Sequence, residues 1–259
     1  MMETMMTRPQ VALGRWCSAL ALALLLLVAA GNTTHAQTND FQTWSSAGIK
    51  TDISKSFTVG FQTQLRLTDY STRVGSILLE PEVGYRVNKY LKLGLGYRFT
   101  IRPGNDHINK TAHRLNLDVE GKKKFGNLGL SLRLRIQQGF QDPYVNENRA
   151  PYSAPTYNRN KLSVEYKVSK LWTPFVEGEL FFPLTDPRHR GLDRYRVTVG
   201  SAFNLKNRNA VDVFFRVQQE VNTANPQTAY ILGLGYTYDL KLPKAKKKKK
   251  DKEKDKMKD

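Results

Sequence analysis

The sequence predicts an all-β fold, an antiparallel transmembrane β-barrel of about 10 to 12 strands. Three observations support this prediction. Apolar and polar residues alternate with a period of two along most of the chain, an export signal stands at the N-terminus, and the connections between strand-like segments are short on one side and long on the other. These features divide the chain into a signal peptide (residues 1–36), a barrel (37–240) and a disordered lysine-rich tail (241–259).

The N-terminus has the pattern of a Sec signal peptide. Arg8 and Arg15 precede an apolar run from Ser18 to Ala30, which is shorter than the roughly 20 residues that a spanning helix needs. We therefore expect cleavage between Ala36 and Gln37 rather than a retained anchor. The single cysteine lies inside the signal, so the mature chain offers no disulfide, thiol or zinc–cysteine chemistry.

The clearest alternation lies in residues 127–137, where one face is apolar and the other carries Arg133 and Arg135. This pattern is typical of a barrel strand whose outer face contacts lipid and whose inner face contacts water. Beyond the signal no apolar run reaches half of the helical spanning length, and the mean hydropathy of −0.52 excludes a helical membrane bundle. Eleven strand-like segments follow in order: Phe41–Thr51, Phe57–Thr68, Ser76–Val87, Leu91–Ile101, Ala112–Lys123, Asn127–Gln138, Lys161–Ser169, Thr173–Phe181, Arg194–Phe203, Ala210–Glu220 and Ala229–Leu240.

The connections alternate in length. Short ones lie at 88–90, 124–126, 169–172 and 205–209, and long ones at 102–110, 139–160, 183–193 and 221–228. Bacterial outer-membrane barrels have short periplasmic turns, long extracellular loops and, as a rule, an even number of strands. Eleven segments break that parity. We therefore expect that the first segment lies inside the lumen or along an edge, or that a further strand lies within 139–160.

The net charge of +18 is unevenly distributed. The tail from Lys241 to Asp259 carries +7, because eleven lysines face four acids, and it is too polar to fold. In an exported protein such a run does not indicate nucleic-acid binding. The tail is expected in the periplasm, either as a solvated segment or in contact with anionic lipid headgroups or an acidic periplasmic partner.

The last segment ends with Gly233, Tyr236 and Tyr238, a spacing that resembles the terminal assembly signal of outer-membrane barrels. The resemblance implies that the barrel-assembly machinery is a partner during insertion. The alternative interpretation is that both tyrosines belong to an aromatic girdle at the membrane interface.

Further motifs point to one family. Gly84-Tyr85-Arg86 and Gly96-Tyr97-Arg98 flank a three-residue turn, the mature N-terminus reads Asp40-Phe41-Gln42-Thr43-Trp44, and Arg66 follows in the second segment. Together they resemble an uncharacterised family of Gram-negative outer-membrane barrels, the domain of unknown function 2490, over residues 40–240. The family has no established activity, so the resemblance implies an architecture, an outer-membrane location and lipid as surroundings, and no functional residues.

Extending the alternation along each segment predicts a network of lumenal charges. Nine arginines and nine acids share the inner face, and a buried charge without a partner is costly, so the balance favours internal ion pairs in a narrow barrel over an open charged pore. The predicted network consists of Arg66, Arg86, Arg98, Arg114, Arg133, Arg135, Arg194, Arg196 and Arg216 with Glu80, Glu82, Asp118, Glu120, Glu165, Glu177, Glu179, Asp212 and Glu220.

Three classes of function remain open. A structural or binding barrel needs only the charge network, and a small-solute channel needs arginines and acids on opposite walls of an open lumen. A lipid hydrolase with a site at the rim would need a histidine beside a serine, and His113 and Ser131 fall on neighbouring segments without a motif around either. With His107 and His189 in long loops, we predict no catalytic residue, no metal site and no cofactor.

Overall fold

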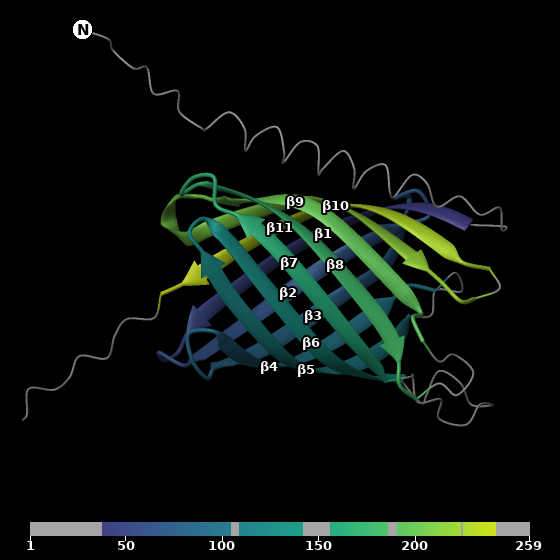
Figure 1. Ribbon diagram of the computed structural model, residues 1–259. Coiled ribbons are helices and arrows are strands. Elements are labelled where there is room, and N and C mark those ends of the chain that lie inside the picture. The colour runs from purple at the N-terminus through teal and green to yellow at the C-terminus, as the bar shows by residue number, and fades with distance from the viewer. Residues whose placement is uncertain (1–37, 105–108, 142–155, 186–190, 224, 242–259) are drawn as a thin grey trace, which may run out of the picture. The chain divides into compact units, whose positions relative to one another are not determined.

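The computed structural model describes residues 38–104, 109–141, 156–185, 191–223 and 225–241 (Figure 1). The signal peptide with its predicted cleavage site, the tail beyond Lys241, and most of the predicted loop 139–160 lie outside these residues. The described strands are β1 (Thr38–Asp52), β2 (Phe57–Thr68), β3 (Arg73–Arg86), β4 (Leu91–Arg102), β5 (Lys110–Phe125), β6 (Leu128–Gln141), β7 (Tyr157–Tyr166), β8 (Trp172–Pro183), β9 (Arg194–Asn204), β10 (Asn209–Glu220) and β11 (Gln227–Leu240), with a short 3₁₀ turn, η2 (Lys206–Arg208).

These eleven strands form one closed barrel, which confirms the predicted all-β barrel of 10 to 12 strands. Consecutive strands pair antiparallel, whereas β1 pairs in parallel with β11 along its whole length, from Thr38 opposite Gln227 to Thr51 opposite Leu240. The expectation that the first segment lies inside the lumen or along an edge is therefore wrong, because β1 is paired on both sides. The alternative, a further strand within 139–160, falls mostly outside the described residues. A parallel seam closes an odd number of strands because both strands that meet there run in the same direction.

The start of β1 is also held by the turn between β2 and β3. The backbone N–H of Tyr70 donates to Asp40, and the hydroxyl groups of Thr43 and Ser71 lie 2.8 Å apart. Asp69, Tyr70 and Ser71 all have positive φ, which folds this turn back toward β1. The N-terminal strand β1 is thus hydrogen-bonded to β2, to β11 and to this turn.

The two ends of the barrel differ. One end carries the connections 53–56, 87–90, 126–127, 167–171 and 205–208, and the other carries 69–72, 103–109, 142–156, 184–193 and 221–226. We call these the short-turn end and the long-loop end. Because β1 and β11 run in parallel, Thr38 lies at the long-loop end and Leu240 at the short-turn end (Figure 1).

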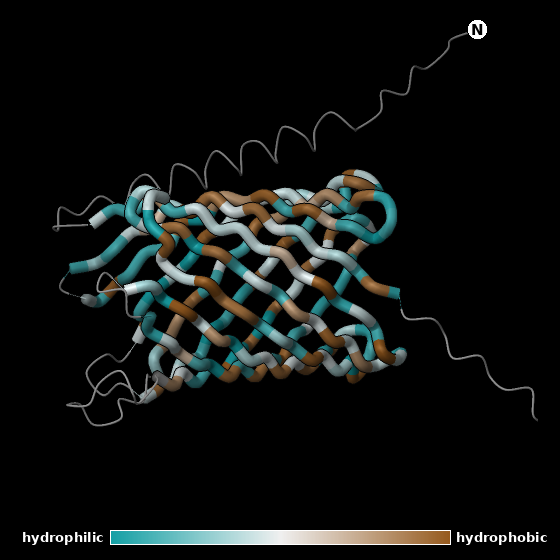
Figure 2. The backbone as a smooth tube through the Cα atoms, turned by 180° about the vertical axis from the view of Figure 1, so that it is seen from behind, coloured by the Kyte–Doolittle hydropathy of each residue, from teal (hydrophilic) through white to brown (hydrophobic). Residues whose placement is uncertain are grey.

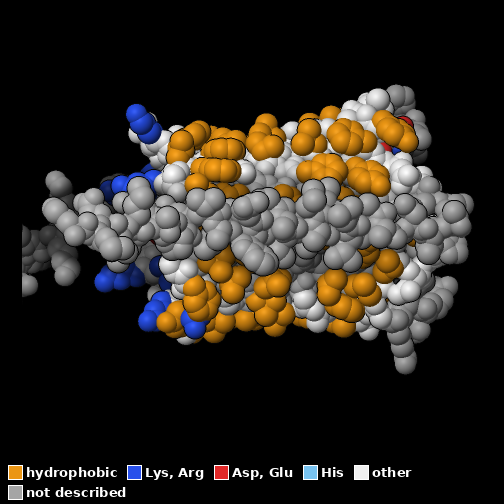
Figure 3. Space-filling view, turned by 45° about the horizontal axis from the view of Figure 1, so that its top comes forward, with side chains coloured by type: hydrophobic (Ala, Val, Ile, Leu, Met, Phe, Trp, Pro, Cys, Tyr) orange, Lys and Arg blue, Asp and Glu red, His pale blue; other side chains and the backbone are white. Residues whose placement is uncertain are grey.

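Hydrophobic and hydrophilic residues alternate along the strands, as the tube coloured by hydropathy shows (Figure 2). The exposed large hydrophobic side chains lie on the outer face. On β4 and β5, for example, Leu93, Leu95, Leu115, Leu117 and Val119 point outward and are exposed. Apolar side chains cover the visible sides of the barrel, and lysine and arginine gather near the short-turn end (Figure 3). The apolar residues of the described strands therefore mainly face outward, and most of the inner face is polar.

Most strand boundaries differ from the predicted ones by one to four residues. The consequential difference is at β7, which begins at Tyr157 rather than at Lys161. Residues 157–160 were predicted to lie in the long loop, and they extend the sheet instead, paired with β6 and β8. This extension brings Arg159 into the barrel.

Candidate functional site

The inner face carries all eighteen residues of the predicted charge network, on strands β2 to β10. The alternation of each strand directs their side chains to the lumen, because the neighbours on either side are the outward apolar residues. Which of these side chains form ion pairs depends on the register between strands and on how far each side chain extends into the lumen.

Apolar side chains fill part of the lumen. Trp44, Ala229 and Ile231 form a buried cluster with Phe214 packed against it, and Ile231 is fully buried. We call these four residues the lumenal plug. Gly233, on the inner face of β11, makes room for it, because the ring of Phe214 occupies the space that a Cβ at this position would take.

Beside the plug, one carboxylate holds three arginines. Glu179 on β8 accepts hydrogen bonds from Arg133 at 2.8 Å, Arg159 at 2.9 Å and Arg196 at 3.3 Å, which come from three different strands. The side chain of Glu179 is only 7% exposed. A carboxylate has two oxygens with about four lone-pair sites, so this one acid can accept from three arginines and join the neighbouring strands β6 to β9. We call these four residues the Glu179 cluster.

Further pairs extend the network around the wall. Arg135 binds Asp118 with two hydrogen bonds of 2.6 Å, and Arg98 pairs with Glu80. Glu177 accepts hydrogen bonds from Lys161 at 2.7 Å and from Ser163 at 2.9 Å, and it also lies 4.0 Å from Arg216. Arg194 pairs with Glu220 toward the long-loop end, and Lys122 pairs with Glu165 toward the short-turn end.

Other predicted members have no such pair. Among the described residues, no ion pair within 4.0 Å involves Arg66, Arg86, Arg114, Glu82, Glu120 or Asp212. Arg86 donates to the carbonyl oxygen of Lys55. Arg66 donates through Nε to Gln64, and its guanidinium carbon lies 3.7 Å from the centre of the Trp44 ring.

Sequence reasoning missed Arg159 and Lys161. The predicted loop 139–160 contains Arg159, although the alternation of Arg159, Lys161, Ser163 and Glu165 with outward Leu162 and Val164 is visible in the sequence. Lys161 begins a predicted strand, but the predicted charge network contains no lysine. Including these residues shifts the predicted balance of nine against nine toward positive charge.

The lumen holds a cavity of about 470 Å³ between the plug and the short-turn end. Inward residues near that end, such as Lys50 and Glu82, are exposed, whereas Trp44, Arg159 and Glu179 at the inner end of the cavity are 5–6% exposed. We call this space the vestibule. It is open toward the short turns and closed by the plug and the Glu179 cluster.

The residues considered for hydrolysis do not come together. His113 points outward near the long-loop end, where its Nδ1 lies 2.5 Å from the hydroxyl of Tyr97, and Ser131 points inward. Their partners in the β5–β6 register are Phe140 and Lys122, so they lie nine positions apart, about 30 Å along the strands. His107 and His189 lie outside the described residues.

Within the described part of the chain, no group of three or more His, Cys, Asp or Glu is placed to hold a metal ion. The same residues contain no helix long and apolar enough to cross a membrane.

The sequence matches the family described as "Protein of unknown function (DUF2490)" over residues 41–229. The chain belongs to this family. The match covers most of β1, all of β2 to β10 and the first three residues of β11. No protein of curated function matches the chain.

Solved structures with similar folds come from outer-membrane proteins. A bacterial polysaccharide outer membrane secretin is 13% identical with a TM-score of 0.45, covering 69% of this chain and 63% of that chain. The beta domain of the Bordetella autotransporter BrkA is 10% identical with a TM-score of 0.42, and the match covers 68% of this chain and 81% of that chain. An anion-selective porin from Comamonas acidovorans is 16% identical with a TM-score of 0.35, and the match covers 71% of this chain and 53% of that chain. The chain thus spans less than two thirds of the secretin and of the porin.

The three residues of the terminal spacing lie on β11. Gly233 faces the plug, whereas Tyr236 and Tyr238 point outward near the short-turn end, and the hydroxyl of Tyr236 donates to Asn209 at 2.6 Å. Both tyrosines therefore stand where a girdle would be, and this position is equally compatible with recognition during assembly.

Proposed function

We propose that this DUF2490 protein is a non-enzymatic outer-membrane β-barrel of a Gram-negative bacterium, with a narrow charged lumen that is closed to free diffusion. The observation that carries the proposal is the combination of an apolar outer surface with a filled middle of the lumen. The apolar outer surface bears on the location of the barrel, and the filled lumen bears on whether solutes can pass through it.

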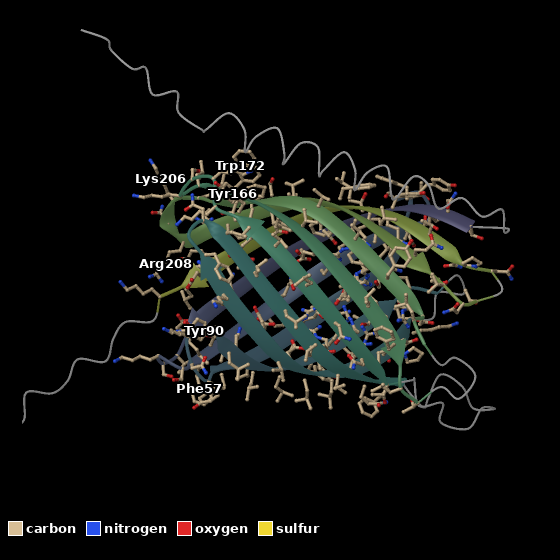
Figure 4. All side chains as sticks on the ribbon, in the orientation of Figure 1. Phe57, Tyr90, Tyr166, Trp172, Lys206 and Arg208 are labelled. Atoms are coloured by element: carbon tan, nitrogen blue, oxygen red, sulfur yellow. The ribbon has the colours of Figure 1, made fainter. Side chains whose placement is uncertain are left out.

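The dimensions of the outer face support a membrane location. Tyr90 directly precedes β4 and Phe99 lies within it, nine residues further along the chain. The two aromatic residues lie near opposite ends of the apolar belt. Nine residues span about 30 Å along a strand and, at a tilt of about 40°, about 23 Å along the barrel axis. The apolar band of an outer-membrane barrel is about 25 Å tall and is bordered by aromatic residues. Phe57, Tyr90, Tyr166 and Trp172 form such a border at the short-turn end (Figure 4).

The burial of inward residues supports a closed lumen. Nine of the eleven strands contribute at least one inward side chain that is at most 9% exposed; among them are Trp44, Leu78, Asn116, Gln137, Arg159, Glu179, Thr198 and Ile231. A water-filled channel through the middle would leave such side chains exposed to solvent. Barrels of this strand number are close to the size at which side chains fill the interior.

The short connections support an orientation with the short-turn end in the periplasm, as in bacterial outer-membrane barrels. Eight exposed cations surround that end, which we call the basic rim: Lys55, Lys89, Lys123, Lys124, Lys167, Lys170, Lys206 and Arg208. The lysine-rich tail begins at the same end, at Lys241. We propose that rim and tail contact anionic headgroups or an acidic periplasmic partner, each basic residue contributing about 1 kcal/mol near an anionic surface, and that the assembly machinery inserts the barrel.

Two tags test location and orientation. One is inserted before Thr38, at the long-loop end, and the other follows Asp259. In intact cells, added protease should remove the first tag and spare the second, and both should fractionate with the outer membrane. Recovery of the protein in the soluble periplasmic extract would refute the membrane location, and loss of the tail tag alone would reverse the orientation.

Conductance tests the closed lumen. The refolded mature protein is added to a planar bilayer after a gel shift of the unboiled sample shows that it is folded. We expect no stepwise currents. Regular steps with ion selectivity would make it a channel, and release of fatty acid from detergent-dispersed phospholipid would make it a lipid hydrolase.

A further inference from the structure

The vestibule has an excess of positive charge. Its lining includes ten cationic side chains against six acidic ones. Toward the short-turn end the charges balance, because Lys50 and Lys92 face Glu82 and Glu120. The excess therefore lies at the inner end, where eight cations surround four acids: Arg66, Arg98, Arg133, Arg135, Arg159, Lys161, Arg196 and Arg216 with Glu80, Asp118, Glu177 and Glu179.

The four inner acids are already engaged. Each accepts at least one ion pair, and Glu179 accepts three. Donors nevertheless remain, because Nε of Arg133 and Nε of Arg159 are buried without a hydrogen-bond partner in the described part of the chain. The protein thus supplies more guanidinium donors than acceptors in a region where unpaired charge is costly. These two buried donors are out of reach of the cavity, so an anion in the vestibule would be bound by guanidinium groups that line it.

Arg66 is the residue best placed to receive one. It lines the vestibule, its guanidinium lies over the Trp44 ring, and Gln64 engages only its Nε. The hydrogen bond from its guanidinium to the described residues is the one through Nε, so its two terminal nitrogens remain for a ligand in the cavity that the side chain lines. An arginine fixed in this way presents a planar pair of donors, which matches the geometry of a carboxylate or a phosphate.

A second guanidinium stands beside it. Arg216 lies 5.4 Å from the centre of the same Trp44 ring, and its own contacts are Thr198 at 2.8 Å and Glu177 at 4.0 Å. Arg196, which is bound to Glu179, lies 5.7 Å from the same ring centre, so three guanidinium groups surround Trp44 at the closed end of the vestibule. An oxyanion seated there would interact with Arg66 and Arg216.

We propose that the vestibule is a binding site for a small solute with a carboxylate or phosphate group, and that Arg66 binds that group directly. The volume of about 470 Å³ lies within the range of small-molecule sites. The basic rim at the mouth would raise the local concentration of such anions. Access from the periplasm rests on the orientation proposed above, whereas the binding site itself does not.

Binding is measured on the folded full-length mature protein in an uncharged detergent, by titration calorimetry. The probes are inorganic pyrophosphate and citrate, which separate phosphate from carboxylate recognition. Arg66→Gln removes the proposed ligand-binding cation and should weaken the preferred probe by tenfold or more, the size expected for a charge-assisted hydrogen bond. Lys206→Gln removes an equal charge from the rim outside the vestibule and should change affinity by less than twofold.

A second variant keeps the test decisive if Arg66→Gln does not fold. Gly96 lines the vestibule, and a Cβ added there would lie 3.6 Å or more from its neighbours, so Gly96→Leu fills the space without changing any charge. It should abolish binding. The proposal is overturned if the folded wild-type protein binds neither probe saturably, or if Lys206→Gln weakens binding as much as Arg66→Gln does. Because the measurement is made in detergent, a negative result leaves the proposed membrane location standing.

Discussion

Replacing Glu179 by glutamine should destabilise the barrel strongly. Glu179 is the only carboxylate within 4.0 Å of Arg133, Arg159 and Arg196 among the described residues, at 2.8, 2.9 and 3.3 Å. The substitution keeps the shape of the side chain and leaves three largely buried guanidinium groups without a counter-charge. Breaking one buried pair in this way costs about 3–5 kcal/mol. We expect the free energy of unfolding to fall by at least about 3 kcal/mol.

The assay is urea unfolding of the refolded barrel in lipid vesicles, followed by tryptophan fluorescence and by the gel shift between folded and unfolded bands. Glu165→Gln is the matched control. It breaks an ion pair of 2.8 Å with Lys122 whose side chains are 34% and 40% exposed, and such pairs contribute about 0–1 kcal/mol. Adding Arg159→Gln to Glu179→Gln should restore part of the loss, because it removes one uncompensated charge. A loss below about 1 kcal/mol for Glu179→Gln would show that water screens the cluster, and would refute a filled lumen.

Three further experiments, with four substitutions, test other parts of the structure. Leu117→Arg, in the middle of the outer apolar belt, should lower the free energy of unfolding in bilayers by about 2–4 kcal/mol. Phe125→Arg, near the short-turn end, should lower it by about 0–1 kcal/mol. Equal losses in urea titrations would contradict a membrane-embedded belt. Trp44→Ala removes the largest side chain of the plug, so it should cost about 3–5 kcal/mol and produce stepwise bilayer currents, and a silent folded variant would place the barrier elsewhere. Gly233→Val puts a branched side chain where the Phe214 ring lies and should abolish the folded band in the gel shift, whereas an unchanged band would show that the ring can move aside.

The candidate site was partly predictable from the sequence. Each strand's alternation identified the inward position of residues such as Arg135, Asp118 and Glu179, because that position depends only on local backbone geometry. It did not identify their partners. Arg135 and Asp118 meet because β5 and β6 pair in one register, and Glu179 meets Arg133 across the intervening strand β7. Such distances depend on register and on how the sheet curves, which no single segment encodes.

The sequence by itself determined that this chain is a β-barrel with an apolar outer face, a charged inner face, short turns at one end and long loops at the other. Period-two alternation and turn length are local properties, so they can be read one segment at a time. Only the tertiary structure decided how the barrel closes and what fills it. The parallel pairing of β1 with β11, the insertion of Trp44 beside Ile231, and the convergence of three arginines on Glu179 bring together residues that are distant in the sequence. Those contacts follow from closing eleven strands into a narrow cylinder, because only closure sets which inner faces oppose one another.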